Sequence, residues 1–408
     1  MKQKCNEIAK PKPGNRPLAL PAQATLVLLG FVGVCAQAQE APPTPDGALR
    51  LSGGLLLYPS VKLSVGQDHN VRASPDDPVS ASTSVLAPTL RAEAKRGSSL
   101  YSLIYAGTYT RYSGSSGDNT NNHDLTAAGA HTYSARSRLG WSLGYQDRAD
   151  PRADALVASP EPDQLRGMAA SALYSYGAKQ AKGRIETEYR FGNKRYQNNL
   201  ATTAGADLDT HLLAGRFFWR VMPRTHLVAE ARLANTTYRV NPDNDNTDTR
   251  LLAGVTWEAT AKTTGSVKLG YQSKRFGTAL KEDASGATYE ASVEWKPLSY
   301  SVLTVGGYRA ANDALNTGDY EQSNGLNLNW RHQWSPALSS RLSVGNATAD
   351  YVNDTRQDDT LSTSVGLTYS LGRRYSLDLD WARTQRDSTV NTYNYKRNTV
   401  LLSLNAAL

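Results

Sequence analysis

The stretch RLLAGVTWEATAKTTGSVKLGYQSKRF, residues 250–276, alternates apolar and polar residues at every second position. Side chains alternate across a β-strand, so this pattern places the apolar residues on one face and the polar residues on the other. The apolar face is formed by Leu251, Ala253, Val255, Trp257 and Ala259 before a turn at 262–265, and by Val267, Leu269 and Tyr271 after it. We therefore predict an antiparallel hairpin with one apolar and one polar face.

The same alternation continues on both sides of this hairpin, from residue 61 to Leu408, and its connections fall into two classes. Eight are short: 95–98, 135–137, 177–183, 222–224, 262–265, 296–298, 335–337 and 372–374. Nine are longer and rich in Asp, Asn, Gly and Ser: 67–80, 113–122, 147–164, 193–208, 241–248, 277–286, 311–320, 350–360 and 384–392. Short turns at one end and long loops at the other are typical of outer-membrane barrels. The pattern predicts an all-β fold, a transmembrane antiparallel up-and-down β-barrel of about 18 strands, with 16 as the alternative.

The composition agrees with a barrel and excludes a helical membrane protein. The chain has 408 residues and a mean hydropathy of −0.50, and its body has no apolar run approaching the roughly 18 residues of a spanning helix. Tyr (22) and Trp (7) outnumber Phe (5), which suits a membrane interface where one edge of the ring is wet. We therefore expect the bacterial outer membrane as the location and its lipid as a partner.

Three segments divide the chain. Residues 1–38 have a basic leader, an apolar run and the small-x-small sequence Ala36-Gln37-Ala38, which predicts a secretory signal peptide. Residues 39–48 are a Pro-rich periplasmic tether, and 49–408 form the barrel. Both cysteines, Cys5 and Cys35, lie in the leader. The leader carries +4 of the formal net charge of +8, and the +4 that remains is too small to predict nucleic-acid binding.

Tryptophan falls on the outward phase of the predicted strands, as an aromatic girdle at the lipid interface requires. These membrane-interface residues are Trp141, Trp219, Trp257, Trp295, Trp330, Trp334 and Trp381.

The opposite phase of the predicted strands is charged. A basic side chain facing lipid at the membrane midplane would cost about 2–4 kcal/mol, so we assign this phase to the interior. The candidate lumen residues, on a path for polysaccharide or ions, are Arg184, Arg190, Arg216, Arg220, Arg232, Arg250, Lys268 and Arg331. Arg216, Arg220, Arg232 and Arg250 could form a positive stripe that binds carboxylates or phosphates. The alternative is that these arginines pair across strands with Glu230, Glu258 and their neighbours and only stiffen the wall.

The remaining motifs predict no catalytic, metal or cofactor site. Gly140 to Gly144 matches the G-x-S-x-G pattern, but Ser142 falls inside a predicted strand and not on a strand-to-helix turn. The acidic loop 241–248 lacks the Gly and distal Glu of a calcium loop, and the six histidines are scattered. Asp68 and Asn70 could bind a cation or sugar hydroxyls, although such residues at a strand end more often cap a turn. We therefore expect no enzyme activity.

A set of N-terminal motifs resembles the putative β-barrel porin 2 family, including the EpsL-like proteins encoded with exopolysaccharide genes. The motifs are Asp68-x-Asn70, then Leu86-x-Pro88-x-Leu90, then Tyr109-Thr110-Arg111-Tyr112. The resemblance implies a channel-like outer-membrane component of exopolysaccharide export, with polysaccharide and periplasmic export components as partners. The alternative function is a general or solute-specific diffusion porin. A third is an adhesive or structural barrel whose loops do the work.

Overall fold

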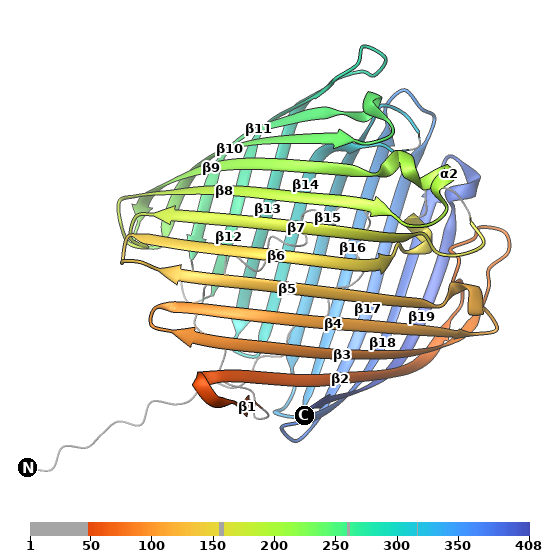
Figure 1. Cartoon of the computed structure of the whole chain (residues 1–408), viewed down its shortest axis with the longest axis horizontal. Helices are drawn as coiled ribbons and strands as arrows, with labels where there is room; N and C mark the ends of the chain where they lie inside the picture. Colours follow the sequence, from red (N-terminus) through yellow and green to blue (C-terminus); the bar gives the residue numbers. More distant parts are fainter. Residues whose placement is uncertain (1–47, 155–158, 259–261, 316) are drawn as a thin grey trace, which may run out of the picture.

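The computed structural model describes residues 48–154, 159–258, 262–315 and 317–408. The predicted signal peptide, 1–38, lies outside these residues, as does the predicted tether apart from Ala48. The described residues form one antiparallel sheet (Figure 1) of β1 (Leu49–Arg50), β2 (Leu55–Asp68), β3 (Ala81–Arg96), β4 (Ser99–Ser113), β5 (Thr120–Thr132), β6 (Ser137–Ala149), β7 (Gln164–Tyr176), β8 (Gly183–Tyr196), β9 (Leu208–Met222), β10 (Thr225–Tyr238), β11 (Asn246–Glu258), β12 (Thr263–Phe276), β13 (Ala284–Leu298), β14 (Ser301–Asp313), β15 (Tyr320–Gln333), β16 (Leu338–Tyr351), β17 (Gln357–Leu371), β18 (Tyr375–Ser388) and β19 (Tyr395–Ala407).

The sheet closes on itself. Each strand from β2 to β19 pairs with its neighbours in the chain, and β19 pairs with β2 from Thr399 opposite Asp68 to Ala407 opposite Ser60. The two-residue β1 pairs only with the start of β2. The prediction of eighteen barrel strands is therefore confirmed over the alternative of sixteen. Closure leaves no strand edge unpaired, which is the condition for β-strands to cross a membrane.

Short and long connections lie at opposite ends (Figure 1), and both ends of the barrel sequence lie at the short-connection end. The long connections contain the short helices η3 (Ser116–Asp118), η4 (Arg152–Asp154), α2 (Leu200–Thr203), η5 (Ala204–Ala206), η6 (Pro242–Asn244) and η7 (Asn391–Tyr393), while η2 (Ser52–Gly54) precedes β2. The turn predicted at 296–298 is wrong. There β13 continues to Leu298 and the turn is Ser299-Tyr300, because Pro297, which has no N–H for the ladder, lies in a bulge where the register shifts.

The outer face is apolar and the interior is polar, the reverse of a water-soluble protein. Leu269, Leu326 and Val65 are 65%, 63% and 58% exposed on the outside. The most buried side chains are polar, among them Ser403 at 1% and Glu230 at 4%. No helix in the described part of the chain is long and apolar enough to cross a membrane.

Candidate functional site

One side of the barrel interior is a network of ion pairs centred on Glu230 of β10. Its carboxylate oxygens accept hydrogen bonds from Arg216 Nε at 2.9 Å, Arg232 Nε at 2.6 Å and Lys268 Nζ at 2.9 Å. Glu230 side-chain atoms are only 1% exposed, so each cation compensates for water that this carboxylate has lost.

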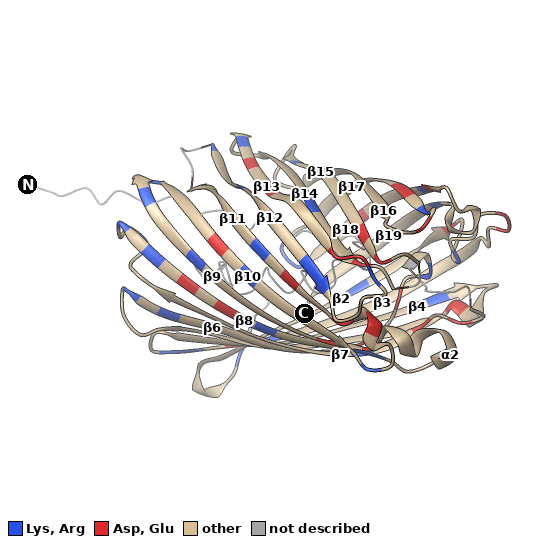
Figure 2. Ribbon diagram, turned by 90° about the horizontal axis from the view of Figure 1, so that it is seen from above, with Lys and Arg blue, Asp and Glu red and all other residues tan. Residues whose placement is uncertain are grey.

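The network extends to both sides through two further carboxylates. Arg232 Nη2 donates to Glu290 Oε2 at 2.8 Å, and Lys268 Nζ lies 2.7 Å from the same oxygen. Arg216 Nη2 donates to Glu188 at 2.7 Å, and Arg190 also pairs with Glu188. The seven residues lie on β8, β9, β10, β12 and β13, and Figure 2 shows charged bands on several of these ribbons. We call this set the charged wall.

The predicted positive stripe is largely neutralised in the structure. Of the eight candidate lumen residues, Arg190, Arg216, Arg232 and Lys268 belong to the charged wall, Arg184 lies 3.5 Å from Glu186, and Arg250 lies 2.8 Å from Asp248. Arg220 and Arg331 form no ion pair with any residue that the structure describes. Pairing across strands, the alternative, holds for Arg216, Arg232 and Lys268, with Glu230 as a partner of all three. Arg184, Arg190 and Arg250 each pair with a carboxylate two residues away on their own strand. Glu258, the other predicted partner, forms no ion pair among the described residues.

The opposite side of the interior has no charged side chain over its middle part. Leu326 is 63% exposed, and Leu328 lies on the same phase of β15, opposite Val305, which is 45% exposed on the outer face. Asn327 and Asn329 therefore face inward, and both are exposed. Solvent therefore reaches the interior beside β15. We call this surface the uncharged wall; its inward residues are Ser323, Gly325, Asn327, Asn329, Ser343, Gly345, Ala347, Ala349, Thr360, Ser362, Ser364, Gly366, Ala382 and Thr384. The sequence analysis missed this surface, because it considered only the charged residues of the inward phase and not the strands that have none there.

The β14–β15 hairpin bends into the barrel at the long-loop end. The Gln272 carboxamide of β12 pairs with the backbone of Ala311, accepting from its N–H and donating to its carbonyl, both at 2.8 Å. Asp313 accepts from Tyr238 at 2.8 Å and Asn246 at 2.9 Å, and pairs with Lys274. These contacts cross from β14 to β10, β11 and β12, so the hairpin narrows the mouth.

Beyond Asp313 the hairpin reaches the far side of the mouth. Leu315 packs against the buried cluster of Leu165, Tyr196 and Ala206, which belong to β7, β8 and η5. Five strands, β9 to β13, lie between β8 and β14 around the barrel. The contact therefore spans the opening.

The connection between β6 and β7 spans the mouth from the other side. The Ala153 carbonyl accepts from Arg386 Nη1 of β18 at 2.9 Å. Arg152 donates to Asp118 of η3, whose side chain is 1% exposed and which also accepts from Arg72 at 2.9 Å. Burial would raise the pKa of Asp118, but hydrogen bonds from Ser115, Arg72 and Arg152 outweigh it and lower the pKa.

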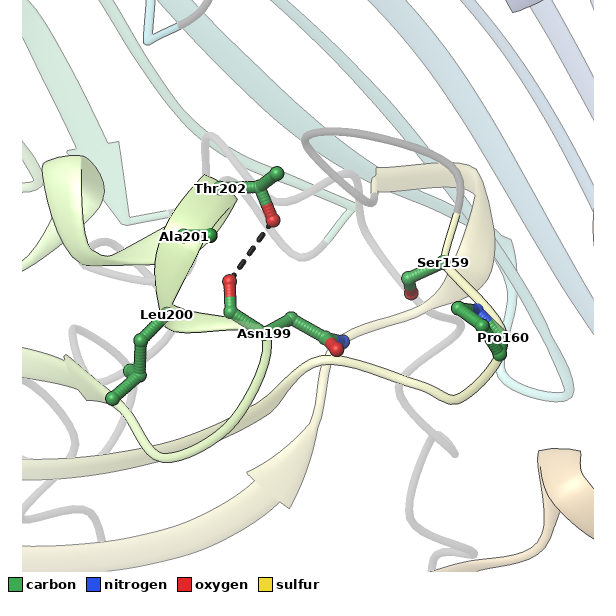
Figure 3. Close-up of a pocket in the computed structure, with 6 residues that line it drawn as sticks. All are labelled: Ser159, Pro160, Asn199, Leu200, Ala201 and Thr202. Atoms are coloured by element: carbon green, nitrogen blue, oxygen red, sulfur yellow. Dashed lines mark hydrogen bonds between the residues drawn. The ribbon is translucent and has the colours of Figure 1, made fainter.

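A small pocket opens between this connection and α2. It has a volume of about 300 Å³ and is lined by Ser159, Pro160, Asn199, Leu200, Ala201 and Thr202, none of them charged. Figure 3 shows Thr202 donating its hydroxyl hydrogen to the Asn199 carbonyl, at 2.9 Å. Its polar groups are thus partly engaged in holding α2.

The barrel geometry agrees with a comparison against protein families. The model of the family described as putative beta-barrel porin 2 matches residues 49–408. The chain belongs to this family. No curated protein matches the chain. With an outer face of exposed Leu and Val around a closed barrel, this porin-family protein lies in the bacterial outer membrane.

Three solved structures match the chain at low identity. The FrpB iron transporter from Neisseria meningitidis matches with a TM-score of 0.49 and 10% identity over 81% of this chain, which spans 63% of FrpB. OccK2 (OpdF) of Pseudomonas aeruginosa matches with a TM-score of 0.47 and 13% identity, over 86% of this chain and 98% of OccK2. OpdO of the same organism matches with a TM-score of 0.47 and 16% identity, over 86% of this chain and 97% of OpdO.

The first family-like motif closes the porin barrel. Asn70 is 1% exposed; its N–H donates to Asp68 Oδ1 at 3.1 Å and its side chain donates to the carbonyls of Ser74 and Lys396. Asp68 pairs with Arg397 of β19. Of the two interpretations of Asp68 and Asn70, the structure favours the turn cap.

Six of the seven tryptophans lie towards the short-connection end on the outward phase, and Trp381 lies midway along β18. The indole N–H of Trp141 donates to His131 at 2.9 Å, and that of Trp330 donates to Ser301 at 3.0 Å. Lys182 Nζ lies 5.3 Å from the Trp219 ring centre. Their role as a lipid-interface girdle stays a prediction.

The motifs set aside in the sequence are built into the wall. Ser142 lies inside β6, 4% exposed, with its hydroxyl 2.7 Å from that of Ser171. A strand interior is not the strained elbow that a nucleophilic serine needs. Within the described residues, no group of three or more His, Cys, Asp or Glu is placed to hold a metal ion.

Proposed function

We propose that this porin-family barrel carries carbohydrate across the outer membrane, and that its cargo is an exopolysaccharide leaving the cell. The observation that carries the proposal is the uncharged wall with its exposed Asn327 and Asn329. Amide and hydroxyl groups donate to and accept from sugar hydroxyls without holding a fixed charge against them. The charged wall opposite is already satisfied by its own ion pairs, so it can guide a chain without binding it tightly.

The unlike charges at the short-connection and long-connection ends of the barrel support movement of the polysaccharide out of the cell. The short connections carry Arg136, Lys179, Lys182, Arg224, Lys262, Arg373 and Arg374 and, in their described part, no acidic residue. Acidic residues outnumber basic ones in the described long connections. An acidic chain in the periplasm would be drawn to the basic end. These basic residues would also contact lipid phosphates, and a periplasmic export component could dock there.

Deletion of the gene tests the proposal, with polysaccharide assayed separately on the cell surface and in the periplasm and the wild-type gene restored as control. Loss from the surface with accumulation in the periplasm is the expected result. Unchanged polysaccharide in both compartments would overturn the export proposal.

The second candidate is a solute-specific diffusion porin, which the two inward connections favour because they narrow the mouth. Purified barrel in a planar bilayer would then pass small sugars and ions, and deletion would leave polysaccharide unchanged while slowing uptake of the solute. A barrel that carries no current would count against both channel functions and favour the adhesive or structural role.

A further inference from the structure

At the short-connection end the uncharged wall gives way to two cations that lie opposite each other, Arg331 of β15 and Arg341 of β16. Arg331 of β15 follows Asn327 and Asn329 on the inward phase and is exposed like them. It forms no ion pair with a described residue, whereas all three arginines of the charged wall have carboxylate partners. Its guanidinium therefore offers free donors to whatever enters beside β15.

The neighbouring strand β16 places a second cation beside Arg331, and that cation pairs with Asp380. Arg331 lies directly opposite Arg341 of β16 in the sheet register, and like charges in that position repel. Arg341 points away, donating to Thr368 Oγ1 at 3.0 Å and pairing with Asp380 of β18.

Gly366 of β17 makes this arrangement possible. A Cβ at residue 366 would lie about 2.5 Å from both the Arg341 Nε and an Asp380 carboxylate oxygen, so any larger residue would push this pair out of its place over β17. Asp380 is thereby committed to Arg341, and Arg331 has no carboxylate partner among the residues that the structure describes.

Resting on the proposed carbohydrate passage, we infer that Arg331 and Asn329 form a receiving site for the carboxylate of an acidic sugar residue that enters from the short-connection end. The planar guanidinium matches a carboxylate with two parallel hydrogen bonds. Asn329, two residues further along the same face, offers an amide to the hydroxyls of the same sugar. The cargo class is therefore a uronate-containing chain.

The test uses the full-length barrel in planar bilayers, with glucuronate as the probe and glucose as its neutral counterpart, each added on the short-connection side. We expect glucuronate to block the potassium chloride current more strongly than glucose. Arg331→Gln should raise the half-blocking glucuronate concentration about tenfold, as the loss of a charge-assisted pair predicts, and Arg331→Lys should restore only part of it.

Arg138→Gln is the matched control, since Arg138 is another inward arginine near the same end, on β6, whose Nη2 donates to the Gly177 carbonyl at 3.3 Å. This substitution removes the same charge from the interior at a position away from the uncharged wall. The half-blocking glucuronate concentration should stay within about twofold of wild type, because only the general electrostatic field of the interior changes. Equal loss of glucuronate block in both variants, or no loss in Arg331→Gln, would overturn the proposed receiving site but not the proposed carbohydrate passage. A folded, inserted barrel without current would overturn both.

Discussion

Asp68 and Arg397 lie 329 residues apart in the sequence, yet their side chains meet, with Arg397 Nη2 2.5 Å from Asp68 Oδ2. The pair joins the end of β2 to β19, the seam where the sheet closes. Asp68 is 3% exposed, so the ion pair is sheltered from water and from screening by salt.

Asp68→Asn should therefore weaken the seam. We expect a loss of about 2 kcal/mol in the free energy of unfolding, the range for a hydrogen bond to a charged partner, since Arg397 would keep its position without its counter-charge. Urea unfolding of the barrel in detergent, followed by circular dichroism, measures the change. Asp77→Asn, in the loop that follows β2, is the control and should leave the curve unchanged; an equal shift in both variants would contradict a special role for the seam.

Gln272 should hold the β14–β15 hairpin in the mouth, because its carboxamide takes the place of the β13 partner that Ala311 lacks. Gln272→Ala removes both hydrogen bonds and leaves the Ala311 N–H and carbonyl unpaired, at a cost of about 1–3 kcal/mol. We expect a larger single-channel conductance and passage of larger sugars. Gln333→Ala, at the other end of the barrel, serves as control, and unchanged conductance in Gln272→Ala would show that the hairpin stays in place without this pair.

Acid should release the β6–β7 connection only well below neutral pH. Because the pKa of Asp118 is lowered in the folded protein, its hydrogen bonds contribute stability above the ordinary value of about 3.9, and this contribution is lost as the pH falls through the lowered pKa. Carboxyl NMR of the full-length protein, assigned with Asp118→Asn, should show Asp118 still ionised at about pH 4. Titration of this carboxyl above its ordinary value would contradict the predicted direction.

Substitution of Glu230 should destabilise the protein more than substitution of any other residue of the charged wall, since its carboxylate pairs with Arg216, Arg232 and Lys268 at once. Glu230→Gln leaves buried cations under-compensated, and we expect a loss of about 3–5 kcal/mol in the free energy of unfolding. Reversal potentials in a salt gradient should also shift towards anions. Glu294→Gln, an acidic residue near the short-connection end that pairs with the exposed Lys296, should change stability by less than about 1 kcal/mol.

The strand pattern and the two classes of connection were readable from the sequence because each is local. Alternation over residues 250–276 fixes which side chains face lipid, and Gly, Pro and Asx clusters mark the ends of strands. The error at 296–298 has the same origin: Pro297 resembles a turn residue, and only the pairing with β14 shows that the strand tolerates it as a bulge.

The partners inside the barrel were not readable, because they depend on closure. Arg232 and Glu290 lie three strands apart, and only the curvature of the closed wall brings them together. The same holds for Ala153 and Arg386, which contact each other across the mouth. Residue types on the inward phase indicate a wet interior, but not which charges neutralise each other and which, like Arg331, are left over.

The two unlike walls also divide the barrel mechanically. Each carboxylate of the charged wall pairs with two or three cations that lie on different strands. These ion pairs link β8, β9, β10, β12 and β13, so the strands resist bending relative to one another. The Ser, Gly and Ala residues of the uncharged wall form no such ion pairs over its middle, and the backbone ladder alone sets the stiffness there. Changes in pore width should therefore arise on the side of β15 to β18, the side along which we propose that the cargo moves.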